Sequence, residues 1–271
     1  MSDALVLNED TGIWTVADAT AVAYPEAGHG DCFRVEETSF WFRHRNRCLV
    51  EALARHPPGG FILDVGGGNG YVARGLADAG HDMVLLEPGS VGAVNARHHR
   101  RLPAVIHATL DAAAIRTASV PAVGLFDVLE HIDDHEGFVR ELARITRPGG
   151  HLYLTVPAFP WLWCAADDEA QHYRRYTADS MRAVLQGCFD IVYWSYLFRR
   201  LVPAFALART LPYRLGLTRS GSATSEADHA SGSATIGRII DRLLQDEIGA
   251  VRNGRSLGVG SSLLVVARRT S

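Results

Sequence analysis

The chain has 271 residues, 47% of them hydrophobic, so it is long enough to bury a sizeable core as one elaborated domain. Its formal net charge of −3 argues against a protein that coats nucleic acid, because such proteins are basic. No C-x-x-C pair occurs, which argues against a zinc site or a disulfide framework and favours a reducing, cytoplasmic location; the four cysteines are Cys32, Cys48, Cys164 and Cys188. The N-terminus lacks the pattern of a signal peptide, and no apolar run reaches the length of a membrane span.

The first 38 residues are polar and are expected to be irregular, with turns but no regular element. A helix is then predicted from about Ser39 to His56, where a Pro-Pro-Gly-Gly sequence ends it. Strands and helices alternate from there. Strands are expected at 62–65, 83–86, 104–107, 122–126 and 151–156, and helices at 71–79, 90–100 and 135–146. This alternation predicts an α/β fold with a doubly wound, parallel sheet.

After this core, a short helix over 177–188 and a strand over 189–195 are expected, and 261–268 is predicted to be the final strand. The last two strands are separated by residues 196–260, a connection far longer than a usual hairpin. Within it, residues 220–233 are rich in Ser, Gly and Ala and are expected to be flexible. The segment 234–252 has apolar residues at helical spacing and predicts an amphipathic helix.

The first part of that connection, Leu197–Arg219, is apolar and carries five arginines, while no acidic residue occurs between Ile191 and Ser225. The favoured interpretation is a cap that packs over the sheet edge or forms a homodimer. The alternative is a basic surface for a membrane or a lipid-linked substrate. Because Pro203 and Pro212 are expected to interrupt the segment, a single long interfacial helix is not predicted.

The most informative segment is 62–70, which reads as a buried strand that runs into a glycine turn. Asp64 lies near the carboxyl end of the strand, and Gly66, Gly68 and Gly70 leave little side-chain bulk in the turn, so a ligand can approach the backbone closely. A helix follows directly. A strand, a glycine turn and a helix N-terminus together predict a cradle for a nucleotide-like cofactor.

Two details narrow the type of cofactor. The pattern is acid-x-Gly-x-Gly-x-Gly, with Asp64 before the glycines, whereas the dinucleotide fingerprint is Gly-x-Gly-x-x-Gly. The next strand ends in Glu87, where a carboxylate accepts the hydroxyls of an adenosine ribose. With these features, residues 61–157 resemble the class I S-adenosylmethionine-dependent methyltransferases.

The resemblance implies a Rossmann-like, seven-stranded sheet whose antiparallel last strand lies between two parallel neighbours. An N-terminal cap or lid (1–60) and a helical insertion (196–260) flank the cofactor-binding core (61–195), and 261–271 returns as the final strand. The cofactor-binding residues that it implies are Asp64, Gly66, Gly68, Gly70, Glu87, Asp111, Phe126 and Asp127. A surface role is an equal alternative for Asp111, because the expected Gly-Asp pair is absent there.

The chemistry is expected after the fourth and fifth core strands, at the carboxyl edge of the sheet. Asp127, Glu130 and His131 fill an acid-x-x-Glu-His pattern that looks like the ubiquinone-pathway O-methyltransferase branch, with Asp in place of the more usual Glu. His172 follows the fifth strand and is expected to face the same pocket.

Three interpretations of this motif stay open. In the first, Glu130 and His131 only order the loop and the amino-acid end of the cofactor. In the second, His131 is a general base for a hydroxyl, with His172 beside it as a second catalytic residue. In the third, Asp127, Glu130, His131 and His172 hold Mg²⁺, Mn²⁺ or Zn²⁺, as the resemblance to small-RNA 2′-O-methyltransferases implies.

Aromatic and basic residues lie on both sides of the core, in segments 40–45 and 172–176. They are candidates to close over the acceptor, although core packing is the alternative for the aromatic ones. The candidate substrate residues are Trp41, Arg45, Tyr173, Arg174 and Tyr176. So many arginines near a predicted pocket suggest an anionic acceptor. This arrangement looks like a bacterial subgroup associated with secondary-metabolite or cell-surface glycan pathways.

The sequence therefore predicts methyl transfer to a small molecule, with a hydroxyl as the first choice of acceptor and an amine as the second. No nucleic-acid partner is expected. A regulatory or scaffolding subunit that binds the cofactor with little turnover is an alternative of another class. A nicotinamide oxidoreductase is a third, which the glycine spacing disfavours.

Overall fold

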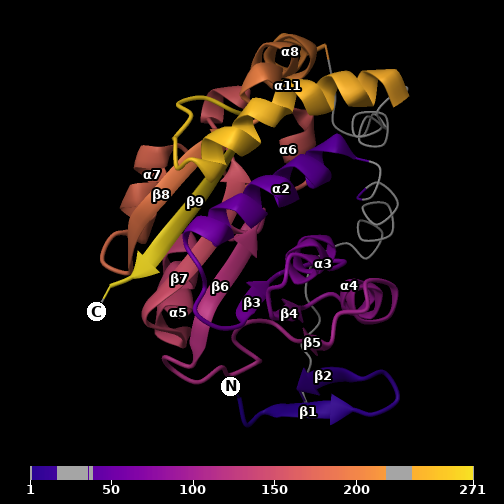
Figure 1. Cartoon of the computed structure of the whole chain (residues 1–271), viewed down its shortest axis with the longest axis vertical. Helices are drawn as coiled ribbons and strands as arrows, with labels where there is room; N and C mark the ends of the chain where they lie inside the picture. The colour runs from indigo at the N-terminus through magenta and orange to yellow at the C-terminus, as the bar shows by residue number, and fades with distance from the viewer. Residues whose placement is uncertain (1, 17–35, 37–38, 218–233, 271) are drawn as a thin grey trace.

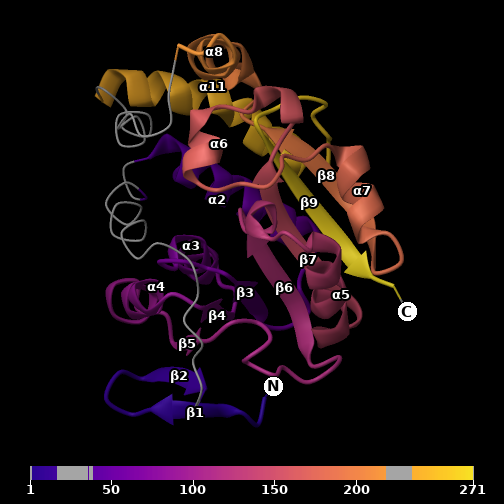
Figure 2. The ribbon, with the colours of Figure 1, turned by 180° about the vertical axis from the view of Figure 1, so that it is seen from behind.

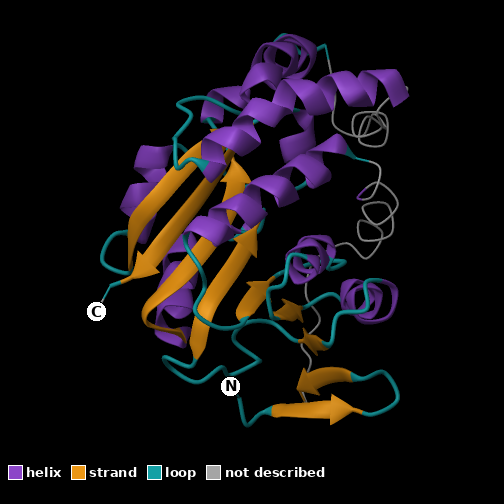
Figure 3. Ribbon diagram, viewed as in Figure 1, coloured by secondary structure: helices purple, strands orange, loops and turns teal. Residues whose placement is uncertain are grey.

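The computed structural model describes residues 2–16, 36, 39–217 and 234–270. A nine-stranded sheet runs through the molecule in the order β1-β2-β5-β4-β3-β6-β7-β9-β8, with helices on both faces (Figures 1, 2 and 3). The strands are β1 (Leu5–Asn8), β2 (Ile13–Val16), β3 (Ile62–Val65), β4 (Met83–Glu87), β5 (Ala104–His107), β6 (Val120–Phe126), β7 (Thr146–Pro157), β8 (Phe189–Leu197) and β9 (Ser262–Arg269).

The predicted core topology is confirmed. Strands β5, β4, β3, β6 and β7 are parallel, and β9 runs antiparallel between β7 and β8. The prediction that residues 1–38 are irregular is wrong for residues 5–16, which form the β1–β2 hairpin and extend the sheet beyond seven strands. The hairpin forms because β2 is rich in β-favouring residues and β5 is otherwise an edge strand with unpaired backbone groups.

The helices are α2 (Phe40–Arg55), α3 (Tyr71–Asp78), α4 (Ser90–Val94), α5 (His135–Ile145), α6 (Ala165–Glu169), α7 (Ala178–Leu185), α8 (Val202–Phe205), α9 (Leu211–Arg214) and α11 (Ala234–Arg252). The side chains of α5 and α7 pack on one face of the sheet, and those of α2, α3, α4 and α11 pack on the other. Successive residues of the central strands alternate between these two cores, as in Leu152 and Tyr153 of β7. None of the described helices is both long and apolar enough to cross a membrane.

Leu49 of α2 is fully buried in the core between this helix and the sheet. Leu49→Ala is expected to lower the free energy of unfolding by about 2–5 kcal/mol, because it removes buried methyl groups and leaves a cavity. Urea unfolding measures this loss. Leu207→Ala is the matched control, since that leucine is 68% exposed, and its effect is expected to stay within about 0.5 kcal/mol. Equal losses in both variants would contradict the assigned packing.

The insertion differs from its prediction in one respect. Residues 199–214 form a continuous helical run of short segments, including a π-helical turn over Ala206–Thr210, so Pro203 and Pro212 do not interrupt it. The run changes its helix type beside each proline, since α8 begins one residue before Pro203 and α9 begins one residue before Pro212, directly after the π-helical turn. The predicted amphipathic helix is confirmed as α11. The segment 220–233, predicted to be flexible, lies outside the described residues.

A buried carboxylate fixes the start of this helical run against the cap. Glu247 of α11 accepts hydrogen bonds from the backbone N–H groups of Phe198 and Arg199, both at 2.7 Å. Its carboxylate also lies 2.9 Å from Nε2 of His44 on α2. Three elements that are far apart in the sequence, namely α2, the end of β8 and α11, therefore meet at one residue.

Candidate active site

The glycine turn lies at the carboxyl end of β3, between that strand and α3. Gly70 adopts φ +78° as the N-cap of α3, and a Cβ atom there would lie 2.9 Å from the Cβ of Ala96. Gly68 has φ +55°, and a Cβ atom there would meet nothing within 4 Å. The turn is thus packed tightly at Gly70 and open at Gly68, where a ligand has access to the backbone.

Two buried carboxylates flank the turn. Glu87, at the end of β4, accepts hydrogen bonds from the N–H groups of Gly68 (2.7 Å) and Gly89 (2.6 Å). Asp64 is fully buried on β3, and its carboxylate oxygens have no hydrogen-bond partner among the described residues. Burial raises the pKa of each carboxyl to about 7, and the bonds that Glu87 accepts oppose this shift only in part.

The raised pKa of Glu87 predicts that cofactor binding depends on pH. The ionised carboxylate is the better acceptor for ribose hydroxyls, and the group loses its charge as the pH falls through about 7. The affinity for S-adenosylhomocysteine is therefore expected to fall by up to about tenfold per pH unit below that value. Calorimetry between pH 5.5 and 8.5 measures the profile, and Glu87→Gln is the control that should make it shallower, with Asp64, whose pKa is also about 7, carrying the slope that remains. An unchanged profile in this variant would exclude Glu87 as the titrating group.

The structure shows a polar network beside the glycine turn that the sequence did not predict. Glu36 accepts hydrogen bonds from Asn69 Nδ2 (3.3 Å) and Arg100 Nη2 (2.9 Å), and Asn95 Nδ2 donates to Asn69 Oδ1 (2.9 Å). Neither the type of these residues nor their spacing distinguishes them from surface residues. Their contacts tie a residue that precedes the core directly to the glycine turn.

Asp127 stands at the end of β6 with φ +55°. Its carboxylate forms an ion pair with Arg45 of α2 and accepts a hydrogen bond from Thr155 Oγ1 at 2.8 Å. Both carboxylate oxygens are thus engaged by the protein. The residues that the structure groups as possible metal ligands are Glu130, His131 and His172, and a part for Asp127 in that set stays a prediction.

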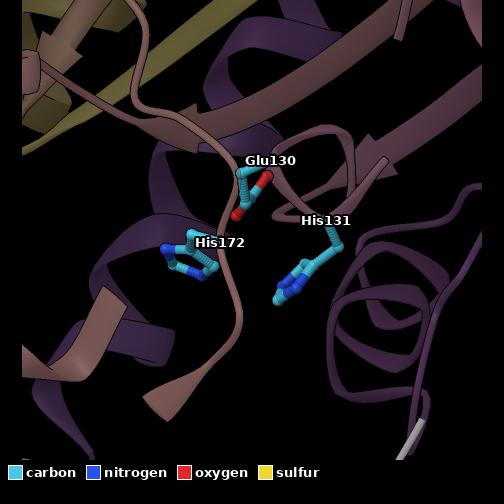
Figure 4. A group of neighbouring side chains, drawn as sticks. All are labelled: Glu130, His131 and His172. Atoms are coloured by element: carbon cyan, nitrogen blue, oxygen red, sulfur yellow. The ribbon is translucent and has the colours of Figure 1, made fainter. Parts of the chain in front are cut away.

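Glu130, His131 and His172 do converge. Each offers one ligand atom, and these three atoms all lie within 4.8 Å of one another (Figure 4). Glu130 and His131 come from the short 3-10 helix Leu129–His131 that follows β6, and the two imidazole rings meet edge to face with their centroids 4.7 Å apart. His131 and His172, which are 41 positions apart in the sequence, thus lie side by side in the structure.

His172 is oriented by a residue that sequence reasoning missed. Its Nδ1 lies 2.9 Å from Oδ1 of Asp167, which also accepts two hydrogen bonds from Arg175, both at 2.8 Å. These bonds lower the pKa of Asp167 to about 2 against the effect of burial. A carboxylate that holds one ring nitrogen fixes the tautomer and leaves Nε2 as the donor atom, an arrangement typical of metal-binding histidines. Nothing in the sequence separates Asp167 from its neighbour Asp168.

The electrostatics of this cluster are unusual. Glu130 is buried, and neither of its carboxylate oxygens has a hydrogen-bond partner among the described residues. Burial, followed by the charge of Asp127, raises its pKa well above the usual range. Burial, followed by the charge of His172, lowers the pKa of His131 to about 4. A neutral imidazole of such low basicity is a weak general base but has the charge state that a metal ligand requires.

The residues present fit a divalent cation. A buried carboxylate without a partner is costly, and a cation between it and two imidazoles would satisfy it. One carboxylate and two histidines form a donor set that suits Zn²⁺ and Mn²⁺ better than Mg²⁺, which prefers oxygen ligands alone.

The candidate acceptor residues divide into two groups. Tyr176 is 1% exposed, and its hydroxyl lies 2.9 Å from His135 Nδ1 and 3.2 Å from the carbonyl oxygen of Leu129. These contacts hold the Tyr176 ring in the core, and its contact with the acceptor stays a prediction. Arg174 donates to the carbonyl oxygens of Ile132 (2.6 Å) and Asp133 (3.0 Å), so it braces the loop after Glu130.

The other two candidates, Tyr173 and Trp41, are not fully buried. Tyr173 is exposed. Trp41 stacks on Phe198 with the ring centroids 3.7 Å apart, which accounts for one of its faces. Of the further cofactor candidates, Phe126 is buried in the core on the α2 side, and Asp111 is exposed in the turn after β5. Their contact with cofactor stays a prediction.

Comparisons with known proteins point to a methyltransferase family. Residues 36–188 match the model of a methyltransferase-domain family. A probable S-adenosylmethionine-dependent methyltransferase of Mycolicibacterium smegmatis is 32% identical over 142 residues, which are 52% of this chain and 54% of that protein. A ubiquinone biosynthesis O-methyltransferase of Xanthomonas oryzae is 31% identical over 36% of this chain and 43% of its own length. The chain thus spans about half the length of the curated relatives that it matches.

Solved structures share the fold. A putative methyltransferase from Haloferax volcanii, solved with the Trm112 methyltransferase activator, has a TM-score of 0.58 and 19% identity over 91% of this chain and 97% of that one. Phosphoethanolamine N-methyltransferase 2 of Haemonchus contortus, in complex with S-adenosyl-L-methionine, has a TM-score of 0.56 and 15% identity over 92% of this chain and 58% of that one. With a family match over more than half of its length and the expected cofactor turn at the sheet edge, the chain belongs to the class I S-adenosylmethionine-dependent methyltransferases.

Proposed function

We propose that this methyltransferase acts on a hydroxyl group of a small-molecule acceptor, and that Glu130, His131 and His172 hold a divalent cation beside that hydroxyl. One observation carries the proposal: the buried carboxylate of Glu130 has no hydrogen-bond partner among the described residues, and two imidazoles face it (Figure 4). A cation held by these three residues would lower the pKa of a bound hydroxyl and orient it.

The remaining residues bind and align the reactants. The turn at Gly66, Gly68 and Gly70, together with Asp64, receives the methionine and ribose side of the cofactor, and Glu87 accepts the ribose hydroxyls. Asp167 keeps the His172 ring in position. In the reaction, the acceptor oxygen attacks the methyl carbon, an O–C bond forms and the C–S bond breaks to release S-adenosylhomocysteine, while the hydroxyl proton passes to solvent water. Holding the two reactants in line supplies much of the rate.

The likeness to a ubiquinone biosynthesis O-methyltransferase, over 36% of this chain, supports a hydroxyl acceptor. Residues 61–195 serve as the cofactor-binding core in this proposal. The N-terminal helix and the insertion cover the acceptor side, and the ion pair of Arg45 with Asp127 joins that helix to the end of β6. A bacterial biosynthetic pathway is the expected setting.

The acceptor class is tested with two matched panels of small molecules, catechols and phenols against anilines and benzylamines of the same ring substitution. Transfer of a labelled methyl group from S-adenosylmethionine is recorded after treatment with a chelator and after addition of Zn²⁺, Mn²⁺ or Mg²⁺. The proposal predicts transfer to the hydroxyl panel that the chelator abolishes and one metal restores. Transfer to the amine panel that persists in the chelator would overturn it.

A further inference from the structure

Residues 199–217, which we call the outer helical run, expose a continuous apolar face. Leu207 (68% exposed), Leu211 (47%) and Leu215 (63%) recur every four residues and thus lie on one side of the run, and Leu217 (74%) follows them. The small residues on the same side are exposed as well, namely Pro203, Ala204 and Ala208. Soluble proteins seldom expose contiguous apolar surface of this kind without a binding partner.

The opposite side of the run is attached to the protein. Val202 and Thr210 are buried, and Thr210 Oγ1 donates to the carbonyl oxygen of Leu162 at 3.2 Å. Glu247 fixes its first turn through two backbone N–H groups. The leucines are therefore presented outward by a run that the fold holds in place. Figures 1 and 2 place α8 at the end of the molecule opposite the β1–β2 hairpin.

The charges along the run are positive. Arg199 and Arg200 pair with the carboxylate of Asp246, at 3.1 Å and 2.8 Å, and the carboxylate of Glu247 adjoins the backbone of Arg199, so the positive charge of the run is carried by Arg209 and Arg214. Arg209 stacks over Phe205 at 4.4 Å, and Arg214 donates to the carbonyl oxygen of Trp161 at 3.1 Å. The sequence contains no Asp or Glu between Ile191 and Ser225. Basic residues beside an apolar helix face complement an anionic lipid surface.

The segment that follows the run offers no apolar cover. Residues 218–233 contain no Val, Ile, Leu, Met, Phe, Tyr or Trp, so this part of the chain lacks side chains that would bury the leucines favourably. Since no described helix is suited to span a membrane, contact along the surface is the mode that fits.

We propose that the outer helical run docks this enzyme on the surface of an anionic lipid membrane, with its leucines in the boundary between headgroups and acyl chains. The run also contacts the loop of the active-site cluster. The hydroxyl of Tyr213 donates to Asp168 at 2.7 Å, and the neighbouring Asp167 orients His172. Exposed Trp161 adjoins the same contacts. Docking therefore holds the loop that carries His172 close to the lipid surface.

The test is co-sedimentation of the full chain with vesicles of phosphatidylcholine alone and with added phosphatidylglycerol. Binding is expected for the anionic vesicles, with weakening at high salt. The variant Leu207→Gln/Leu211→Gln/Leu215→Gln is expected to bind at least about tenfold more weakly, because three apolar side chains lose their contact with lipid. The control Val6→Gln/Leu7→Gln, which alters exposed residues of the β1–β2 hairpin, should bind as the unmodified chain does.

Binding of S-adenosylhomocysteine, measured by calorimetry, is expected to be equal in all three proteins. Equal binding shows that both variants are folded. Because neither measurement uses an acceptor or a metal, the test does not depend on the proposed reaction. The proposal is overturned if the unmodified chain does not bind anionic vesicles, or if the leucine variant binds them equally well. It is also overturned if sedimentation velocity shows a dimer that the leucine substitutions dissociate while vesicle binding is absent, since the face would then join two copies of the chain.

Discussion

Replacing Glu130 with Gln is expected to lower kcat/KM for methyl transfer by about a thousandfold and to change the affinity for S-adenosylhomocysteine by less than about threefold. Glu130 supplies the only carboxylate of the three-residue cluster, and an amide of nearly the same shape cannot neutralise a cation there. The glycine turn follows β3 and Glu87 ends β4, whereas Glu130 follows β6. Binding of S-adenosylhomocysteine should therefore be preserved. Steady-state kinetics and calorimetry on the same preparation separate the two effects.

Glu136→Gln is the matched control, because this glutamate is exposed on α5 and forms only a surface ion pair with Arg140 at 3.9 Å. It should leave both kcat/KM and product affinity unchanged. Thermal unfolding of each variant verifies that the fold is intact. A loss below tenfold for Glu130→Gln, with the control unchanged, would assign Glu130 to the ordering of its loop.

Replacing Glu87 with Ala is expected to weaken S-adenosylhomocysteine binding by about a hundredfold or more. The substitution removes an acceptor for the ribose hydroxyls, and hydrogen bonds to a charged group contribute about 1.5–3 kcal/mol each. It also removes the acceptor of the Gly68 and Gly89 N–H groups, which shape the turn. Calorimetry at pH 8, where the carboxyl group of Glu87 is ionised, measures the loss.

Asp82→Ala is the matched control, since Asp82 is an exposed acid immediately before β4, at the opposite end of the same strand. Its effect on product affinity should be less than about twofold. If the two variants lost affinity equally, the carboxylate at the end of β4 would have no specific part in cofactor binding.

Much of the fold could be predicted because its signals are local. The alternation of apolar strands and helices and the glycine turn after Asp64 lie within short stretches of sequence, and the structure confirms the parallel core and the antiparallel last strand. The β1–β2 hairpin could not be predicted in the same way. Its strands are four residues long, and β2 depends on pairing with β5, which is about 90 positions further along the chain.

The candidate site also combines residues that the sequence reveals with contacts that it does not. The motif at Glu130 and His131 is visible in the sequence, whereas its surroundings depend on contacts between distant residues. Arg45 and Asp127 are 82 positions apart, and their ion pair joins α2 to the end of β6. The roles of Asp167 and Tyr176 follow from burial and hydrogen bonds that residue type does not reveal.

The most direct test of a metal-assisted methyltransferase is calorimetric titration of the chelator-treated chain with Zn²⁺, Mn²⁺ and Mg²⁺ in the presence of saturating S-adenosylhomocysteine. The account predicts product binding without metal, one saturable isotherm for a divalent cation, and loss of that isotherm in His131→Ala while product binding is retained. Product binding without any metal isotherm would contradict the role assigned to Glu130, His131 and His172.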